Sequence, residues 1–240
     1  MKPVLTIAFM LGVLCSEAFA QIHSVNVFGS YSIALGKRLS VTRADALGGG
    51  VELRVRVSDN INISVIGGFE RYSIDQDSAL AKWNWRFWVE RYSGIVKDNL
   101  ASDSSLSATL NPVQYMEVVP ILAAVSIELS PAENLTVRPS IGGGVLFYTR
   151  SLYLQEEWQK RFHALDYTFE YSYRNFAGDK KGNPFVVFGR AELSYQLSDL
   201  FTVDASARYT TALNTDGKYG YDEFPFRDMV TFTVGLSFLY

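Results

Sequence analysis

Residues 229–240 read Met-Val-Thr-Phe-Thr-Val-Gly-Leu-Ser-Phe-Leu-Tyr, with apolar residues at alternate positions. Side chains of a β-strand point alternately to its two faces, so this stretch predicts a strand with one apolar face. That face consists of Val230, Phe232, Val234, Leu236, Phe238 and Tyr240. A closed barrel requires its last strand to pair with its first, and a strand of this kind suits that position.

The same alternation recurs along the chain and predicts eight strands in all. Three short turns, at residues 58–60, 130–134 and 198–200, are rich in turn-forming residues and join alternating segments. The other apolar faces lie within residues 25–35, 47–57, 61–69, 119–129, 135–147, 187–197 and 201–209. The composition agrees, because 14 Tyr and 16 Phe against 7 Pro suit an all-β domain.

The remaining connections, at residues 36–46, 75–113, 151–184 and 214–228, are long and fall at the opposite end of the predicted barrel. This organisation resembles the small bacterial outer-membrane barrels of the OmpA/OmpX type. The resemblance implies an all-β, eight-stranded antiparallel up-and-down transmembrane β-barrel with short periplasmic turns and long extracellular loops. It also implies a location in the outer membrane of a Gram-negative-type bacterium, with a wall that contacts outer-membrane lipid.

The aromatic end of the last strand resembles the signal by which this family is recognised for insertion. The resemblance assigns Phe238 and Tyr240 to contact with the outer-membrane insertion machinery. At the other end, Lys2, an apolar run from Val4 to Cys15 and the sequence Ala18-Phe19-Ala20 predict a secretory signal peptide over residues 1–20. We therefore expect the mature protein to be one barrel domain over residues 21–240, without the chain's single cysteine.

The polar faces of the predicted strands carry ten charged residues. They are Glu52, Arg54, Arg56, Glu70, Glu128, Arg138, Arg190, Glu192, Asp204 and Arg208. In a membrane barrel these residues fill the lumen, and their balanced charge favours a neutralising network over ion selectivity. The register across the third short turn places Arg190 opposite Arg208, and Glu128 lies diagonal to Arg138 across the second.

A soluble lipocalin-like barrel would give the same alternation with the opposite polarity, with charged residues outside and apolar residues around a cavity. The loop asymmetry and the terminal Tyr240 favour the membrane barrel. Two triple glycines, at residues 48–50 and 142–144, lie within predicted strands and indicate bends in the wall.

The long loops are rich in aromatic residues. Residues 166–176 alternate again and predict a hairpin that rises above the membrane. Residues 83–88 predict either an anchor at the membrane interface or part of the same protruding sheet. The aromatic residues expected to contact a partner or the interface are Trp83, Trp85, Trp88, Trp158, Tyr167, Tyr171 and Tyr173.

These features predict a non-enzymatic surface barrel whose loops bind a surface partner or serve a structural role. One alternative is capture or lateral transfer of a small hydrophobic ligand, indicated by the glycines at 142–144 and the inward Val118 and Leu122. Another is a lipid-modifying enzyme that uses His163, the one histidine in an outer loop. A net charge of -3 gives no reason to expect nucleic acid, and the sequence indicates no metal site and no cofactor.

Overall fold

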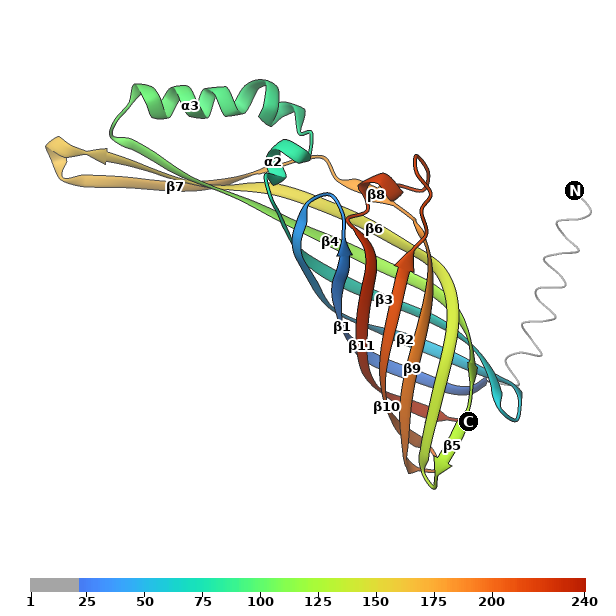
Figure 1. Cartoon of the computed structure of the whole chain (residues 1–240). Helices are drawn as coiled ribbons and strands as arrows, with labels where there is room; N and C mark the ends of the chain where they lie inside the picture. Colours follow the sequence, from blue (N-terminus) through green and yellow to red (C-terminus); the bar gives the residue numbers. More distant parts are fainter. Residues whose placement is uncertain (1–21) are drawn as a thin grey trace, which may run out of the picture.

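The structure, a computed structural model, describes residues 22–240 (Figure 1). The predicted signal peptide lies outside the described residues. Eight strands close into an antiparallel ring: β1 (Ile22–Lys37), β2 (Val41–Ser58), β3 (Ile61–Gln76), β4 (Leu106–Ile127), β6 (Leu135–Phe162), β9 (Phe185–Ser198), β10 (Phe201–Ala212) and β11 (Phe226–Leu239). A short strand, β5 (Leu129–Ala132), pairs with the start of β6.

The last strand closes the barrel. β11 pairs antiparallel with β1 from Ser24↔Leu239 to Lys37↔Phe226, and with β10 on its other side. The Tyr240 amide then donates a hydrogen bond to the His23 carbonyl over 3.1 Å. The predicted eight-stranded antiparallel barrel is therefore confirmed.

The three predicted short turns lie at one end of the barrel, and the long connections lie at the other (Figure 1). The predicted loop over residues 36–46 is wrong, since only residues 38–40 leave the strands. The ends of β1 and β2 remain ordered because they pair with different neighbours. Lys37 pairs with Phe226 of β11, whereas Val41 pairs with Gln76 of β3.

Two strands continue far beyond the barrel wall. β4 and β6 stay paired up to Leu106↔Lys160, and β7 (Tyr167–Phe176) pairs with the end of β6 through Phe162↔Tyr167. We call residues 106–113, 151–162 and 167–176 the arm; it leans out sideways from the barrel mouth in Figure 1. The predicted hairpin is confirmed, but most of the predicted loop over residues 151–184 is strand, including β8 (Lys180–Gly182).

Helical segments cover one face of the arm. They are α2 (Ala79–Lys82), a π-helical turn η1 (Trp88–Tyr92) and α3 (Ser93–Ser102), which lies along the arm in Figure 1. The expectation that residues 83–88 form part of the protruding sheet is therefore wrong. No helix within residues 22–240 combines the length and apolar character needed to cross a bilayer.

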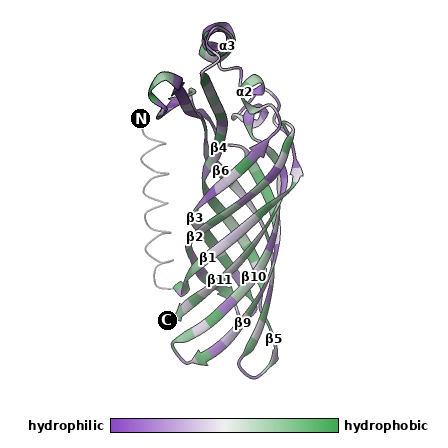
Figure 2. Ribbon diagram, turned by 90° about the vertical axis from the view of Figure 1, so that its left-hand side faces the viewer, coloured by the Kyte–Doolittle hydropathy of each residue, from purple (hydrophilic) through white to green (hydrophobic). Residues whose placement is uncertain are grey.

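The wall is apolar outside and charged inside. On β2, Leu47 is 72% exposed on the outer face, whereas Glu52 is 1% exposed in the lumen. Figure 2 shows apolar residues distributed over the strands of the wall. The lipocalin-like alternative is wrong, because it requires the charged residues of the strands to face the solvent.

Candidate functional site

A network of ion pairs fills the half of the lumen near the short turns. Arg190 on β9 binds both oxygens of Glu52 on β2, with Nη1–Oε2 and Nη2–Oε1 distances of 2.7 Å. Arg54 Nη2 lies 2.7 Å from Oε2 of Glu192 and 3.0 Å from Oε2 of Glu52. All four side chains are buried, so each charge is compensated where water cannot reach it.

The network extends toward the short turns. Arg138 binds Glu192 through Nη1 at 3.0 Å and Glu128 through Nε at 3.4 Å. Asp204 accepts a hydrogen bond from the Asn26 amide over 2.6 Å, and further bonds from serine hydroxyls. Arg56 lies at the rim, where its side chain remains 44% exposed. Nine of the ten charged residues expected in the lumen therefore lie inside it, and Arg56 lies at its edge.

The local register was predictable, but the ion pairs across the barrel were not. Arg190 is paired with Arg208 in the ladder between β9 and β10, and Arg138 contacts Glu128, as the turns indicate. Arg208, however, reaches across the lumen to Glu70 on β3 at 3.5 Å. Such contacts depend on barrel closure, which brings β3 opposite β10.

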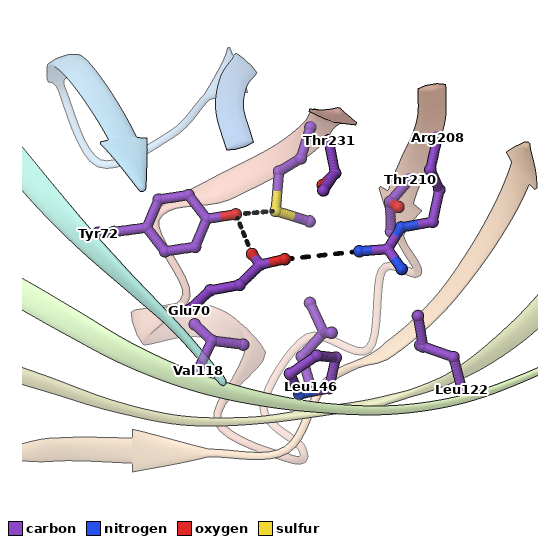
Figure 3. Close-up of a pocket in the computed structure, with 10 residues that line it drawn as sticks. Glu70, Tyr72, Val118, Leu122, Leu146, Arg208, Thr210 and Thr231 are labelled. Carbon is purple, nitrogen blue, oxygen red and sulfur yellow. Dashed lines mark hydrogen bonds and ion pairs between the residues drawn. The ribbon is translucent and has the colours of Figure 1, made fainter. Parts of the chain in front are cut away.

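Beyond this network, apolar side chains enter the lumen around a second polar group, which Figure 3 shows. Glu70 accepts hydrogen bonds from Tyr72 at 2.9 Å and from Ser32 at 3.1 Å, and it faces Arg208. Apolar residues, including Val118 and Leu122, pack around this group. The cavity between them has a volume of about 10 Å³. That is about the space of one water molecule.

The mouth of the barrel is closed by the last long connection. Phe224 and Tyr221 are buried in the core of the barrel, and the guanidinium of Arg38 lies 3.9 Å from the ring centroid of Tyr221. Buried Arg150 on β6 donates to Oε1 of Gln76 at 2.8 Å and to Oε1 of Gln114 at 2.7 Å. Eight strands leave an interior that side chains can fill, and here they fill it.

A second apolar core joins the helical segments to the arm. It contains Ala79, Trp83, Trp85, Leu152, Leu154 and Ala177. Trp83 is 4% exposed and its indole donates to the Gly178 carbonyl over 3.1 Å. The expectation that Trp83, Trp85 and Trp158 contact an external partner is wrong, because all three side chains are buried, with Trp158 also 3% exposed.

A buried carboxylate holds the helical segments on the arm. Glu156 on β6 accepts hydrogen bonds from the Tyr92 hydroxyl at 3.0 Å, the Trp158 indole at 2.9 Å and the Asn175 amide. Tyr92 also bonds to Tyr173. Burial raises the pKa of Tyr92 and of Tyr173, so both hydroxyls keep their protons. The sequence interpretation missed Glu156 and Arg150, although the alternation of β6 continues through both positions.

At the far end of the arm, Lys160 on β6 lies 3.0 Å from Asp103, the residue that follows α3. Hydrogen bonds from Ser105, together with Lys160, lower the pKa of Asp103 to about 2. The helical segments are therefore tied to the arm at both ends.

The remaining predicted aromatic residues keep part of their surface exposed. Tyr167 is 54% exposed, and Tyr171 and Tyr173 are also exposed, whereas Trp88 is half-buried against the second core. The rings of Trp158, Tyr171 and Tyr173 form a row with successive centroids 6.2 Å apart and nearly parallel planes. Within this row Tyr171 and Tyr173 of β7 are exposed, and Trp158 of β6 is buried.

The two histidines lie at opposite ends of the molecule. His163 begins the turn at the tip of the arm and is exposed, while Nε2 of His23 lies 2.7 Å from Nη2 of Arg56 at the other rim. Within residues 22–240, no group of three or more His, Cys, Asp or Glu side chains is arranged to hold a metal ion.

The apolar outer wall and the ion-paired lumen define this protein as a transmembrane β-barrel. No protein-family model matches the sequence, and no curated protein matches it. Among solved structures, neisserial surface protein A is 10% identical, covers 90% of this chain and 96% of its own, and has a TM-score of 0.46. Ail of Yersinia pestis is 10% identical over 92% of this chain and 99% of its own, with a TM-score of 0.41. The outer membrane protein OprG of Pseudomonas aeruginosa is 8% identical over 92% and 97%, with a TM-score of 0.46.

Proposed function

We propose that this protein is a non-enzymatic surface barrel of a Gram-negative-type outer membrane that presents its arm to a binding partner. The observation that carries the proposal is the exposure of β7: from Tyr167 to Arg174 every residue is exposed, on both faces of the strand. A strand that is exposed on both faces and paired on one side adds little to the barrel's own packing, so its aromatic residues suit recognition.

The lumen supports the same proposal. The ion-pair network and the closed mouth leave no continuous passage among the described residues, which argues against diffusion of solutes. The outer wall contributes contact with lipid. Phe238 and Tyr240 are exposed on that wall, where the proposed contact with the insertion machinery would reach them.

The interior disfavours the hydrophobic-ligand alternative. The cavity beside Val118 and Leu122 is far smaller than the several hundred cubic ångströms of a typical ligand pocket. The wall is also continuous at the triple glycine, where Gly143 pairs with Ala123 on one side and with Val187 on the other.

Removal of the arm tip tests the proposal. Residues 157–172 would be replaced by an Asn-Gly turn between Glu156 and Tyr173, which face each other in the ladder as a hydrogen-bonded pair. We expect intact cells that express this variant to lose adhesion to an array of immobilised surface proteins and glycans. The barrel should keep its heat-modifiable gel shift. Unchanged adhesion with an intact barrel would refute the proposal.

A further inference from the structure

The outer edge of β7 is an unpaired strand edge. The Ala177 amide donates to the Leu152 carbonyl of β6 over 3.0 Å. Because residues in an antiparallel pair bond to their neighbour alternately, odd-numbered residues of β7 bond to β6. The backbone groups of Thr168, Glu170, Ser172, Arg174 and Phe176 therefore point to the free edge. Among the described strands, β7 pairs with β6 alone.

This edge is complementary to itself. We propose that β7 pairs antiparallel with β7 of a second copy of this chain, about a two-fold axis that passes between the two Ser172 residues. In this register Glu170 lies directly opposite the partner's Arg174, and Arg174 opposite the partner's Glu170. Opposite charges at facing positions stabilise an antiparallel pair. The inference rests on the proposed function, since it names the partner of the same strand.

The neighbouring symmetric registers are worse. A two-fold axis at residue 170 places Glu170 opposite the partner's Glu170, and an axis at residue 174 places two arginines together. Like charges at facing positions destabilise a strand pair. The sequence of β7 therefore favours the axis at Ser172 over the axes at Glu170 and Arg174.

In this register, the side chains that face each other across the two β7 strands are compatible on both faces of the sheet. Glu170 and Arg174 lie on the face away from Glu156, where their present partners are neutral amides: Gln159 donates to Glu170 at 3.1 Å, and Arg174 donates to Gln155 at 2.7 Å. On the other face, Tyr171 lies opposite the partner's Tyr173. Both are exposed, and facing aromatic residues add stability to a strand pair.

The geometry of the arm suits two molecules in one membrane. The face that carries Glu170 continues along β6 to the outer wall at Phe147, and the arm leans outward from the barrel, so this face turns toward the membrane (Figure 1). α3 lies on the other side of the arm. The two-fold axis of an antiparallel pair is perpendicular to its sheet and thus runs roughly along the membrane normal. Two barrels that span the same membrane in the same orientation can be related by a two-fold axis only if that axis runs along the membrane normal.

A cysteine scan tests the register. In a chain that also carries Cys15→Ser, Ser172→Cys should form a disulfide-linked dimer in intact outer membranes, since residues facing each other across an antiparallel pair lie within disulfide range. Thr168→Cys is the matched control on the same face. In the proposed register the sulfur atoms introduced at position 168 of the two copies lie about 25 Å apart, so Thr168→Cys should form no disulfide-linked dimer.

Charge exchange tests the pairing itself in the Ser172→Cys background. Glu170→Arg should reduce cross-linking about tenfold, since it replaces two attractive pairs by two repulsive ones. The double variant Glu170→Arg with Arg174→Glu should restore it. The glutamine partners within the chain accept either charge, so they do not explain such a rescue.

Equal cross-linking of the two cysteine variants would overturn the proposal, and so would a Ser172→Cys chain that stays monomeric while a soluble maleimide labels its thiol. Loss of adhesion in the arm-tip deletion would then show that β7 serves a different partner. If adhesion also survives that deletion, the proposed function fails as well.

Discussion

The two halves of β6 bury charge in different ways. In the lumen, Arg138 contacts Glu192 and Glu128, and the network joins strands that lie far apart in the sequence. In the arm, buried Glu156 has no ion pair among the described residues and is held by neutral donors from η1, β6 and β7. The barrel is therefore stabilised by ion pairs that form only when the ring is closed, whereas the arm has its own core and is expected to open separately.

The largest expected effect is in the lumen. Arg54→Ala leaves Glu192 and Glu52 buried with fewer cations, and the free energy of unfolding should fall by about 3–5 kcal/mol. Urea unfolding in detergent micelles, followed by the gel shift, measures this loss. The matched control is Arg56→Ala at the exposed rim, where the loss should stay below about 1 kcal/mol. Equal losses for the two variants would contradict the role of the buried network.

The next effect is confined to the arm. Trp83→Ala empties much of the second core, and we expect the free energy of opening the helical segments to fall by about 3 kcal/mol. Limited proteolysis should then cleave within residues 77–105, while the urea midpoint of the barrel stays unchanged. A parallel fall in barrel stability would show that the arm and the barrel unfold as one unit.

A smaller effect tests the bend of the wall. A Cβ atom added at Gly142 would lie 2.6 Å from Cζ of Phe188 and would also meet the Ala123 carbonyl. Gly142→Ala should therefore destabilise the barrel by about 1–3 kcal/mol in urea unfolding. At Gly67 the added atom meets only Cδ1 of Ile121 at 3.9 Å, so Gly67→Ala should be nearly neutral. If the two variants unfold at the same urea concentration, close packing at Gly142 does not contribute to the stability of the barrel.

The smallest effect concerns an exposed ion pair on the helical segment. Arg86 lies 2.8 Å from Glu90 one turn away, with both side chains exposed. Arg86→Ala should change the free energy of opening this segment by less than about 0.5 kcal/mol. The rate of limited proteolysis measures this change. A larger change would mean that surface charge, and not the second core, holds the segment in place.

The barrel itself was predictable because alternation and turn chemistry are local properties of the sequence. The three short turns fixed the register nearby, which is why Arg190 opposite Arg208 and Arg138 beside Glu128 followed from the sequence. Residues 36–46 were predicted as a loop because they connect two alternating segments. Pairing of β1 with β11 and of β2 with β3 orders them instead.

The burial of the arm tryptophans was not predictable in the same way. A dense aromatic loop is compatible with an interface anchor, a sheet or a core, and the sequence does not show which surface covers it. Only the packing of Trp83 and Trp85 against Leu152 and Leu154 reveals a core. The same packing leaves β7, and not the tryptophans, as the exposed part of the arm.

The eight strands, their two faces and the charges that line the lumen follow from the sequence alone, because side-chain alternation and turn residues act over a few positions. The folded barrel sets which charges meet across the lumen, how far β4 and β6 extend, and which aromatic residues remain exposed. Those outcomes depend on contacts between residues far apart in the chain, whose geometry exists only once the ring is closed.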